Sequence, residues 1–135
     1  MDQLLPLPGT YKVAIEMSGP EWMEKAKRVA GTFHATTTRQ RNASHCVYVV
    51  LLHDPAGMGR WGLYVGQTSR DPDLRFDQHK AGYKASRAVK RHGVRLLPAL
   101  VEHLNPMWGW EALELEAALA EAFRAAGVPW VEGGH

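Results

Sequence analysis

The chain of 135 residues is long enough for one domain with a hydrophobic core, and 45% hydrophobic with 22% charged residues excludes wholesale disorder. Its longest apolar run, residues 46–52, is strand-sized and falls short of the roughly 18–20 residues that span a bilayer. The first residues lack a charged region followed by an apolar stretch, so no secretory signal is expected. A single cysteine, Cys46, excludes an internal disulfide and the paired-cysteine zinc motifs, and predicts a reducing, cytoplasmic setting.

The net charge of +2 conceals an uneven distribution along the chain. Residues 1–59 carry six basic and five acidic side chains, and residues 60–95 carry nine basic and three acidic ones, a balance of +6. Residues 96–135 carry one Arg and six Glu, a balance of −5. A basic block of this kind suits a polyanionic partner, because clustered Lys and Arg release counterions from a phosphate backbone. A solvated helix surface is the alternative.

Residues 1–44 are predicted to form an N-terminal strand-helix extension, and residues 45–135 the main domain. A short strand is expected over residues 11–17, followed by a helix over residues 20–30 with Pro20 in its first turn. Residues 36–44 are rich in Thr, Arg, Gln and Asn without periodicity, which is typical of a mobile linker or loop.

Two strands are predicted next. Residues 46–52 (CVYVVLL) read as a strand buried on both faces, and residues 61–67 (WGLYVGQ) as its partner, joined by a loop that contains Pro and two Gly. This pair places Tyr48 and Tyr64 on neighbouring strands. Whether the two rings share a face depends on the register.

A helix is predicted from Asp71-Pro72 to about residue 80, ending at Gly82. Arg75 and His79 are four residues apart in it and project from one face. A second, basic helix is expected over residues 84–92, and an edge or irregular strand over residues 94–104.

A final helix is predicted over residues 111–126, before Gly127. Glu116 falls within its apolar stripe, where a carboxylate is costly unless it is paired or binds a metal. A side chain that reaches solvent at the edge of the stripe is the alternative. The whole pattern predicts an α+β fold with a small central mixed or antiparallel sheet flanked by helices.

In this order, these features resemble the GIY-YIG nuclease superfamily over about residues 44–134. The first signature reads Cys46-Val47-Tyr48, the second reads Tyr64-Val65-Gly66, and Arg75, His79 and Glu116 follow. The resemblance implies a metal-dependent endonuclease that hydrolyses DNA phosphodiester bonds. It implies one Mg²⁺ or Mn²⁺ ion with Glu116 as its protein ligand, and Arg75 as a clamp on a phosphate oxygen.

The resemblance also implies roles for four residues of the two paired strands and of the helix predicted to begin at Asp71-Pro72. Tyr48 would orient the attacking water, or deprotonate it if nearby cations lowered its pKa from about 10. His79 would take or relay that proton, Tyr64 would hydrogen-bond the water or the phosphate, and Gly66 would let backbone approach the substrate. The alternatives are core packing for the tyrosines, an ion pair with Asp71 for Arg75, and a surface position for His79.

The basic block is predicted to bind the DNA backbone next to this site. The residues assigned to it, besides Gly66, are Lys80, Lys84, Arg87, Lys90 and Arg91. No membrane partner is expected, and the protein is expected to act as a monomer or homodimer. Trp108 and Trp110 could stack on bases, but an aromatic plug under the last helix is the favoured interpretation.

The sequence departs from the family at two points. Cys46 stands where the first signature has glycine, and no Asn follows Asn105, whereas many members carry one after the metal-binding Glu. Two other functions therefore stay open: a catalytically weak or inactive nucleic-acid-binding or interaction module on the same scaffold, and a small-molecule enzyme.

Overall fold

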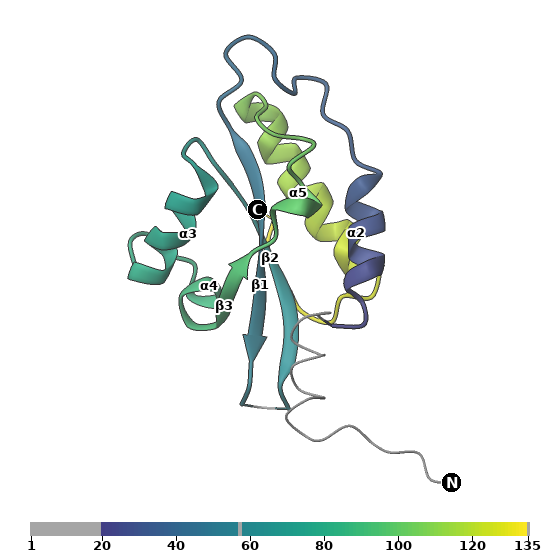
Figure 1. Cartoon of the computed structure of the whole chain (residues 1–135), viewed down its shortest axis with the longest axis vertical. Helices are drawn as coiled ribbons and strands as arrows, with labels where there is room; N and C mark the ends of the chain where they lie inside the picture. Colours follow the sequence, from purple (N-terminus) through teal and green to yellow (C-terminus); the bar gives the residue numbers. More distant parts are fainter. Residues whose placement is uncertain (1–19, 57, 135) are drawn as a thin grey trace, which may run out of the picture.

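A computed structural model describes residues 20–56 and 58–134, and the strand predicted over residues 11–17 lies outside them. Four strands form one sheet in the order β3-β1-β2-β4, in which β4 runs parallel to β2 and the other pairs are antiparallel (Figure 1). The predicted α+β class with a mixed, helix-flanked sheet is thus confirmed. The elements are α2 (Met23–Gly31), β1 (Cys46–Asp54), β2 (Arg60–Thr68), α3 (Pro72–Ala81), α4 (Arg87–His92), β3 (Gly93–Leu96), η1 (Pro98–Leu100), α5 (Gly109–Ala125) and β4 (Val131–Gly133).

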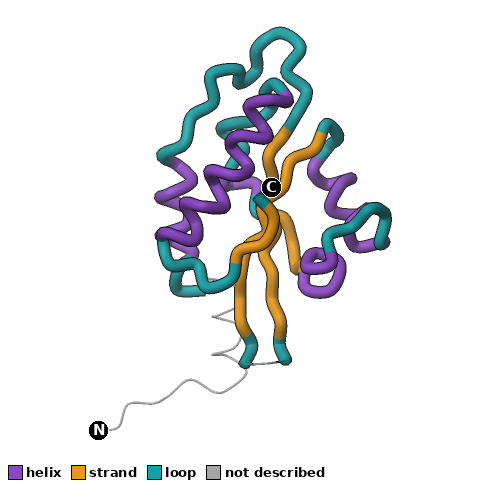
Figure 2. The backbone as a smooth tube through the Cα atoms, turned by 180° about the vertical axis from the view of Figure 1, so that it is seen from behind, coloured by secondary structure: helices purple, strands orange, loops and turns teal. Residues whose placement is uncertain are grey.

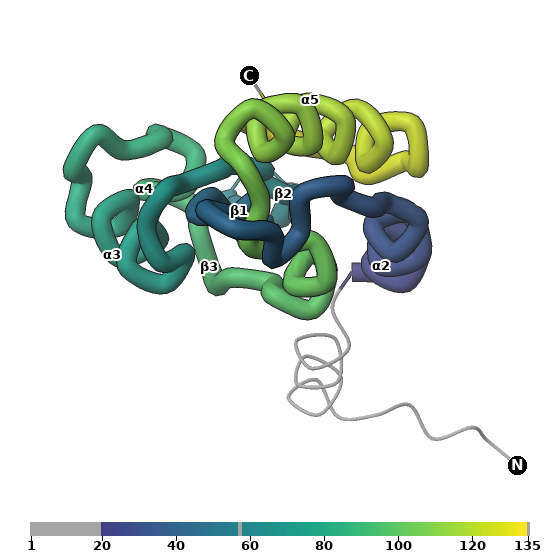
Figure 3. Tube along the Cα trace, turned by 90° about the horizontal axis from the view of Figure 1, so that it is seen from above, coloured from purple at the N-terminus to yellow at the C-terminus, as the bar shows by residue number. Residues whose placement is uncertain are grey.

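The sheet lies between two layers of helices, α3 and α4 on one side and α2 and α5 on the other (Figure 3). Alternate residues of β1 divide between the two faces, as the period of a strand requires. Val47, Val49 and Leu51 pack toward α2 and α5, while Tyr48 and Val50 pack toward α3 and α4. The central strand is therefore buried on both sides, as its apolar run predicts.

Helix α2 is part of the main core. Met23, Ala26 and Ala30 are buried in the same cluster as Leu119 and Phe123 of α5. The prediction that residues 1–44 form an extension is therefore wrong for residues 20–44, which pack as part of the domain.

The predicted mobile linker is an anchored loop that arches over one end of the sheet (Figure 2). The backbone amides of Thr36 and Thr37 donate to the carboxylate of Glu111 at 2.8 Å each, and the amide of Arg39 donates to the carbonyl of Pro106 at 2.8 Å. The polar composition of the loop serves these tertiary hydrogen bonds, which local sequence rules do not anticipate.

The helix that carries two candidate site residues begins and ends as predicted. The Asp71 side chain accepts a hydrogen bond from the amide of Asp73 at 2.8 Å, and Pro72 occupies the first turn. Gly82 ends α3 at φ 90°, a left-handed conformation that glycine adopts without strain. These caps fix how far α3 extends along the sheet.

Two predicted elements are shorter in the structure. Helix α4 begins at Arg87 rather than at residue 84, because Ser86 caps it and Lys84 has a positive φ of 43°. Strand β3 ends at Leu96 rather than continuing to residue 104, because Pro98 begins the short helix η1. In the part of the chain that the structure describes, no helix has the length and apolar character needed to cross a membrane.

Candidate active site

The paired strands bring the two signature tyrosines together. Tyr48 of β1 is opposite Gly66 of β2, and Tyr64 is opposite Val50, so both tyrosines point to the face that α3 covers. Their ring centroids lie 6.1 Å apart. The register, which the sequence left open, therefore places both hydroxyl-bearing rings in one site.

Gly66 has a different role from the predicted one. A Cβ atom at this position would lie 2.5 Å from Cζ and 2.6 Å from the hydroxyl oxygen of Tyr48. The space beside the Gly66 backbone is filled by the tyrosine ring, so Gly66 accommodates Tyr48 rather than a close approach of the substrate.

His79 is buried, with 1% of its surface exposed, which excludes the surface alternative. Its Nδ1 accepts a hydrogen bond from the amide of Ser86 at 2.9 Å, and its Nε2 lies 2.8 Å from the Tyr48 hydroxyl. Burial, together with the charge of Arg75, lowers the pKa of His79 to about 4. At neutral pH the imidazole is therefore uncharged, and Nε2 carries the hydrogen and donates it to Tyr48.

This arrangement corrects two predicted roles. Burial raises the pKa of Tyr48, an effect that Tyr64 reinforces and Arg75 only partly offsets, so Tyr48 is a neutral hydroxyl rather than a base. Burial also raises the pKa of Tyr64. His79 cannot take a proton at Nε2, because that nitrogen already carries one, so it orients Tyr48 instead of relaying its proton.

Arg75 lies beside the tyrosines and also holds the loop after α3. Its guanidinium donates to the carbonyls of Lys84 at 2.7 Å and Tyr83 at 3.2 Å, and to the side chain of Gln78 at 3.3 Å. The alternative pairing with Asp71 is wrong. Three of the five guanidinium hydrogens are used in these bonds, which leaves two for a phosphate oxygen.

A polar pocket of about 190 Å³ opens next to this guanidinium. Arg70, Arg75 and Lys84 all line it, together with Thr68 and Ser69 at the end of β2. The three cations give the pocket the charge that an anionic group requires.

Glu116 is buried within α5, with 8% of its surface exposed, and so does not reach solvent freely. Burial raises the pKa of this carboxyl to about 7, partly offset by the backbone of Gln67. The charge of Glu116 in turn adds to the rise in the pKa of Tyr48 and of Tyr64, so the carboxylate acts electrostatically on both hydroxyls. Among the described residues it forms no ion pair.

Gln67 is a site residue that the sequence patterns did not indicate. Its side-chain oxygen is buried and, within the described chain, has no hydrogen-bond partner. Gln67 alternates with Gly66 along β2 and therefore faces the α5 side of the sheet, where Glu116 lies. Carboxylate and amide oxygens are the donors that Mg²⁺ or Mn²⁺ prefers, so the chemistry of these two side chains is compatible with a hard cation. Across residues 20–56 and 58–134, no three His, Cys, Asp or Glu side chains form a metal-binding group.

The predicted phosphate-binding residues fall into two groups. The ammonium of Lys80 donates to the carbonyls of Gly93 at 3.0 Å, Lys90 at 3.1 Å and Val89 at 3.4 Å, so it caps the end of α4 and is not free for phosphate. The remaining four, Lys84, Arg87, Lys90 and Arg91, are exposed.

Comparison with protein-family models, with curated proteins and with solved structures finds no match to this chain.

Proposed function

We propose that this protein is a divalent-metal-dependent endonuclease that hydrolyses DNA phosphodiester bonds. The observation that carries the proposal is the convergence of Tyr48, Tyr64 and His79 from β1, β2 and α3, with the buried carboxylate of Glu116 on α5 acting electrostatically on both tyrosines. A buried carboxylate, one buried and one half-buried tyrosine, and an arginine suit a reaction in which negative charge develops on phosphate oxygens.

In this proposal, the hydroxyls position the reactants. His79 donates to Tyr48 and holds that ring in place, and the hydroxyl hydrogen of Tyr48 can then be donated to Tyr64, to a water molecule or to a phosphate oxygen. Tyr64 supplies a second hydroxyl on the same face, and Arg75 supplies fixed positive charge beside both. Nothing in this set requires Tyr48 to ionise.

Glu116 and the side-chain oxygen of Gln67 would hold one Mg²⁺ or Mn²⁺ ion. When bound, such an ion makes a nearby water more acidic and stabilises charge on the leaving oxygen. The protein would contribute the carboxylate of Glu116 to the ion, and no basic side chain of the described residues pairs with this carboxylate.

The DNA backbone would follow the face of the sheet that α4 flanks. Arg87 and Arg91 line a pocket of about 210 Å³ together with Arg60, whose guanidinium stacks 3.8 Å from the ring centroid of Trp130. Arg60 and Tyr64 lie on the same side of β2, about 13 Å apart along the strand. A phosphate chain running from Tyr64 to Arg60 would therefore meet positive charge at both ends of this path.

Cleavage of supercoiled plasmid and of labelled single strands in Mg²⁺, Mn²⁺ or EDTA tests the proposal. The wild-type protein should cut with either ion and not in EDTA. Tyr48→Phe should fold, bind DNA and cut more slowly by a factor on the order of 10². Val94→Ala is the control, because Val94 is exposed and lies outside the cationic pocket, and it should cut normally.

Salt-dependent DNA binding without cleavage in either ion would overturn the nuclease proposal and favour the binding module instead. One observation favours that second candidate: the guanidinium of Arg75 already uses three hydrogen bonds to hold protein groups.

A further inference from the structure

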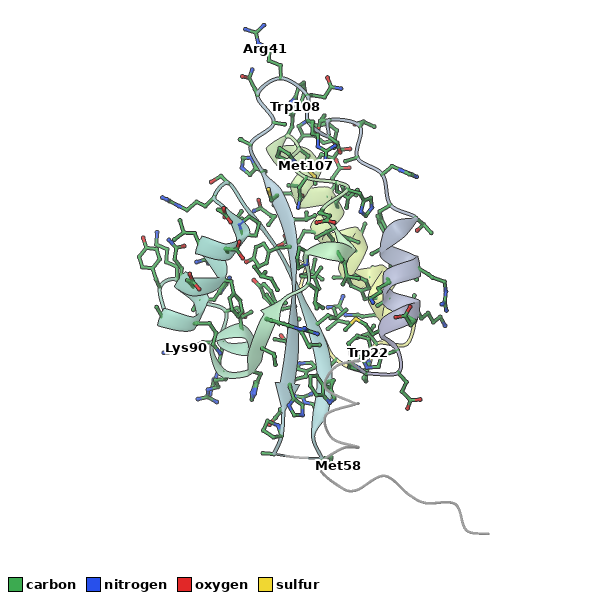
Figure 4. All side chains as sticks on the ribbon, in the orientation of Figure 1. Trp22, Arg41, Met58, Lys90, Met107 and Trp108 are labelled. Carbon is green, nitrogen blue, oxygen red and sulfur yellow. The ribbon has the colours of Figure 1, made fainter. Side chains whose placement is uncertain are left out.

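Two tryptophans stand exposed at the start of α5, where an aromatic plug was the favoured prediction. Trp108 is 41% exposed and Trp110 is 51% exposed. Figure 4 shows Trp108 below the loop that carries Arg41, at the end of the molecule over which this loop arches. Exposed aromatic side chains that follow each other this closely in the chain make this end of α5 a candidate binding surface.

The two indoles are held on a rigid support. Glu111, one residue after Trp110, is buried and accepts hydrogen bonds from both the amide and the hydroxyl of Thr36 and of Thr37. The Thr37 hydroxyl accepts in turn from the amide of Trp108 at 2.9 Å. The start of α5 and the loop are thus fixed to each other, so the indoles need little ordering on binding.

The same surface carries positive charge. Arg39 and Arg41 are exposed on the loop, and neither pairs with an acidic side chain of the described chain. The carbonyl of Arg41 accepts a hydrogen bond from the Trp108 indole nitrogen at 2.9 Å, which ties this arginine to the aromatic surface. Glu114, four residues beyond Trp110, lies exposed on the same face of α5 as this indole and would repel an anion there, so a phosphate would lie toward the loop with its two arginines.

We propose that Trp108, Trp110, Arg39 and Arg41, here called the tryptophan platform, bind unpaired nucleotides of a nucleic-acid strand. Indole faces stack on bases of any sequence, and guanidinium groups contact the adjacent phosphates. The platform rests on the proposed function, since the same strand would continue to the candidate active site. Gly109 and Glu116 are seven residues apart on α5, about 10 Å along the axis, or roughly three base steps.

The charge on the platform favours a nucleic acid over a protein partner. Exposed tryptophans next to arginines also occur at protein interfaces, where they act as anchors. Here the loop that carries the two arginines lies at the same end of the sheet as the turn between β2 and α3 (Figure 1), and Arg70 in that turn lines the cationic pocket. A bound polyanion could therefore meet positive charge along this end of the molecule.

Fluorescence anisotropy in EDTA, with a labelled single strand and a duplex of the same sequence, tests the platform without any cleavage. Trp110→Ala should weaken single-strand binding by about 5- to 150-fold and leave duplex binding unchanged, since stacking needs unpaired bases. Trp110→Phe should restore most of the affinity. Leu113→Ala, which removes an equally exposed apolar side chain one turn away, is the control and should bind normally.

Arg41→Ala should reduce the salt dependence of single-strand binding by about 0.7 in the log–log slope. Equal losses on single strand and duplex, or no loss in either, would overturn the platform. The platform would also be overturned if the protein self-associates, and Trp110→Ala abolishes this self-association while single-strand binding stays intact. If the wild-type protein cuts DNA but Trp110→Ala does not weaken single-strand binding, the platform is refuted and the nuclease proposal stands. If Trp110→Ala weakens single-strand binding but the wild-type protein does not cut, the nuclease proposal is refuted and the platform stands.

Discussion

Nε2 of His79 donates a hydrogen bond to the hydroxyl of Tyr48 across 2.8 Å, and the direction of this bond is set by a backbone amide on the far side of the imidazole. Because the amide of Ser86 can only donate, Nδ1 must accept and Nε2 must carry the hydrogen. One loop amide therefore controls the chemistry of a tyrosine on a neighbouring element.

Replacing His79 should remove an acid-sensitive part of the free energy of unfolding. The folded-state pKa is about 4 and the unfolded value 6.5, so the unfolded chain binds a proton first. The stabilisation is present above pH 6.5 and is lost as the pH falls toward 4, by up to about 3 kcal/mol. Urea unfolding of His79→Gln should show a flatter profile over this window.

His34→Gln provides the control, since His34 is exposed and should leave the profile of the wild-type protein unchanged. If His79→Gln loses stability in acid as steeply as the wild type, the imidazole is not buried in its neutral form.

Gly66→Ala should displace the Tyr48 ring. The added methyl group would overlap the tyrosine, so we expect a loss of about 1–3 kcal/mol in unfolding free energy together with a loss of cleavage. Thermal unfolding and plasmid cutting measure the two effects. Gly31→Ala meets no atom within 4 Å and should lower neither property. A fully active Gly66→Ala protein would show that the position of Tyr48 does not matter for cleavage.

Glu116→Gln should stabilise the metal-free protein at high pH. The folded pKa of about 7 exceeds the ordinary value of 4.5, so the wild type loses stability as the pH rises through this interval and the variant does not. The difference in Tm between variant and wild type should be near zero at pH 4.5, grow up to pH 7, and then stay level.

Addition of Mg²⁺ at pH 8 should raise the Tm of the wild type and leave that of Glu116→Gln unchanged, because the neutral amide lacks the charge that holds the ion. Retained plasmid cutting by Glu116→Gln would be incompatible with a metal-binding role for this residue. A fall in Tm at every pH would instead indicate that the Glu116 side chain stabilises the fold.

Alanine substitution of Lys80 should affect stability and not DNA binding, whereas substitution of Arg87 and Arg91 should affect DNA binding and not stability. Lys80→Ala removes a cap from α4 and should lower stability by about 1 kcal/mol, a Tm shift of roughly 4 °C, without changing the salt dependence of duplex binding. The double substitution Arg87→Ala with Arg91→Ala should lower the log–log salt slope by about 0.9 per lost contact and leave the Tm in place. An unaltered salt slope would show that Arg87 and Arg91 are solvated surface residues that do not contact DNA.

Much of the fold could be predicted because its signals are local. The apolar run of β1 indicates burial on both faces, and Asp71, Pro72 and Gly82 set the limits of α3. Strand β4 could not be predicted, since parallel pairing with β2 joins Leu63 to Val131, and no neighbouring residue signals it. The integration of α2 into the core likewise depends on contacts with α5 that only the tertiary structure creates.

The candidate site, like the fold, could be predicted in part. Residue types and spacing indicate Tyr48, Tyr64, His79 and Glu116, but not the state of their protons, which depends on burial and on the Ser86 amide. A sequence pattern identifies side chains, but it does not show which backbone amides will donate hydrogen bonds to them. Gln67 follows Gly66 directly, and the one signal that marks it, an unpartnered buried oxygen, exists only once β2 and α5 are packed together.

The carboxylate of Glu111 joins loop residues 74 and 75 positions earlier to the first turn of α5. Amide hydrogens in loops usually exchange with solvent within the fastest local openings, whereas an amide bonded to a buried carboxylate exchanges only when the larger unit opens. The amides of Thr36 and Thr37 should therefore exchange at rates like those of α5, so this irregular segment behaves kinetically as part of the core.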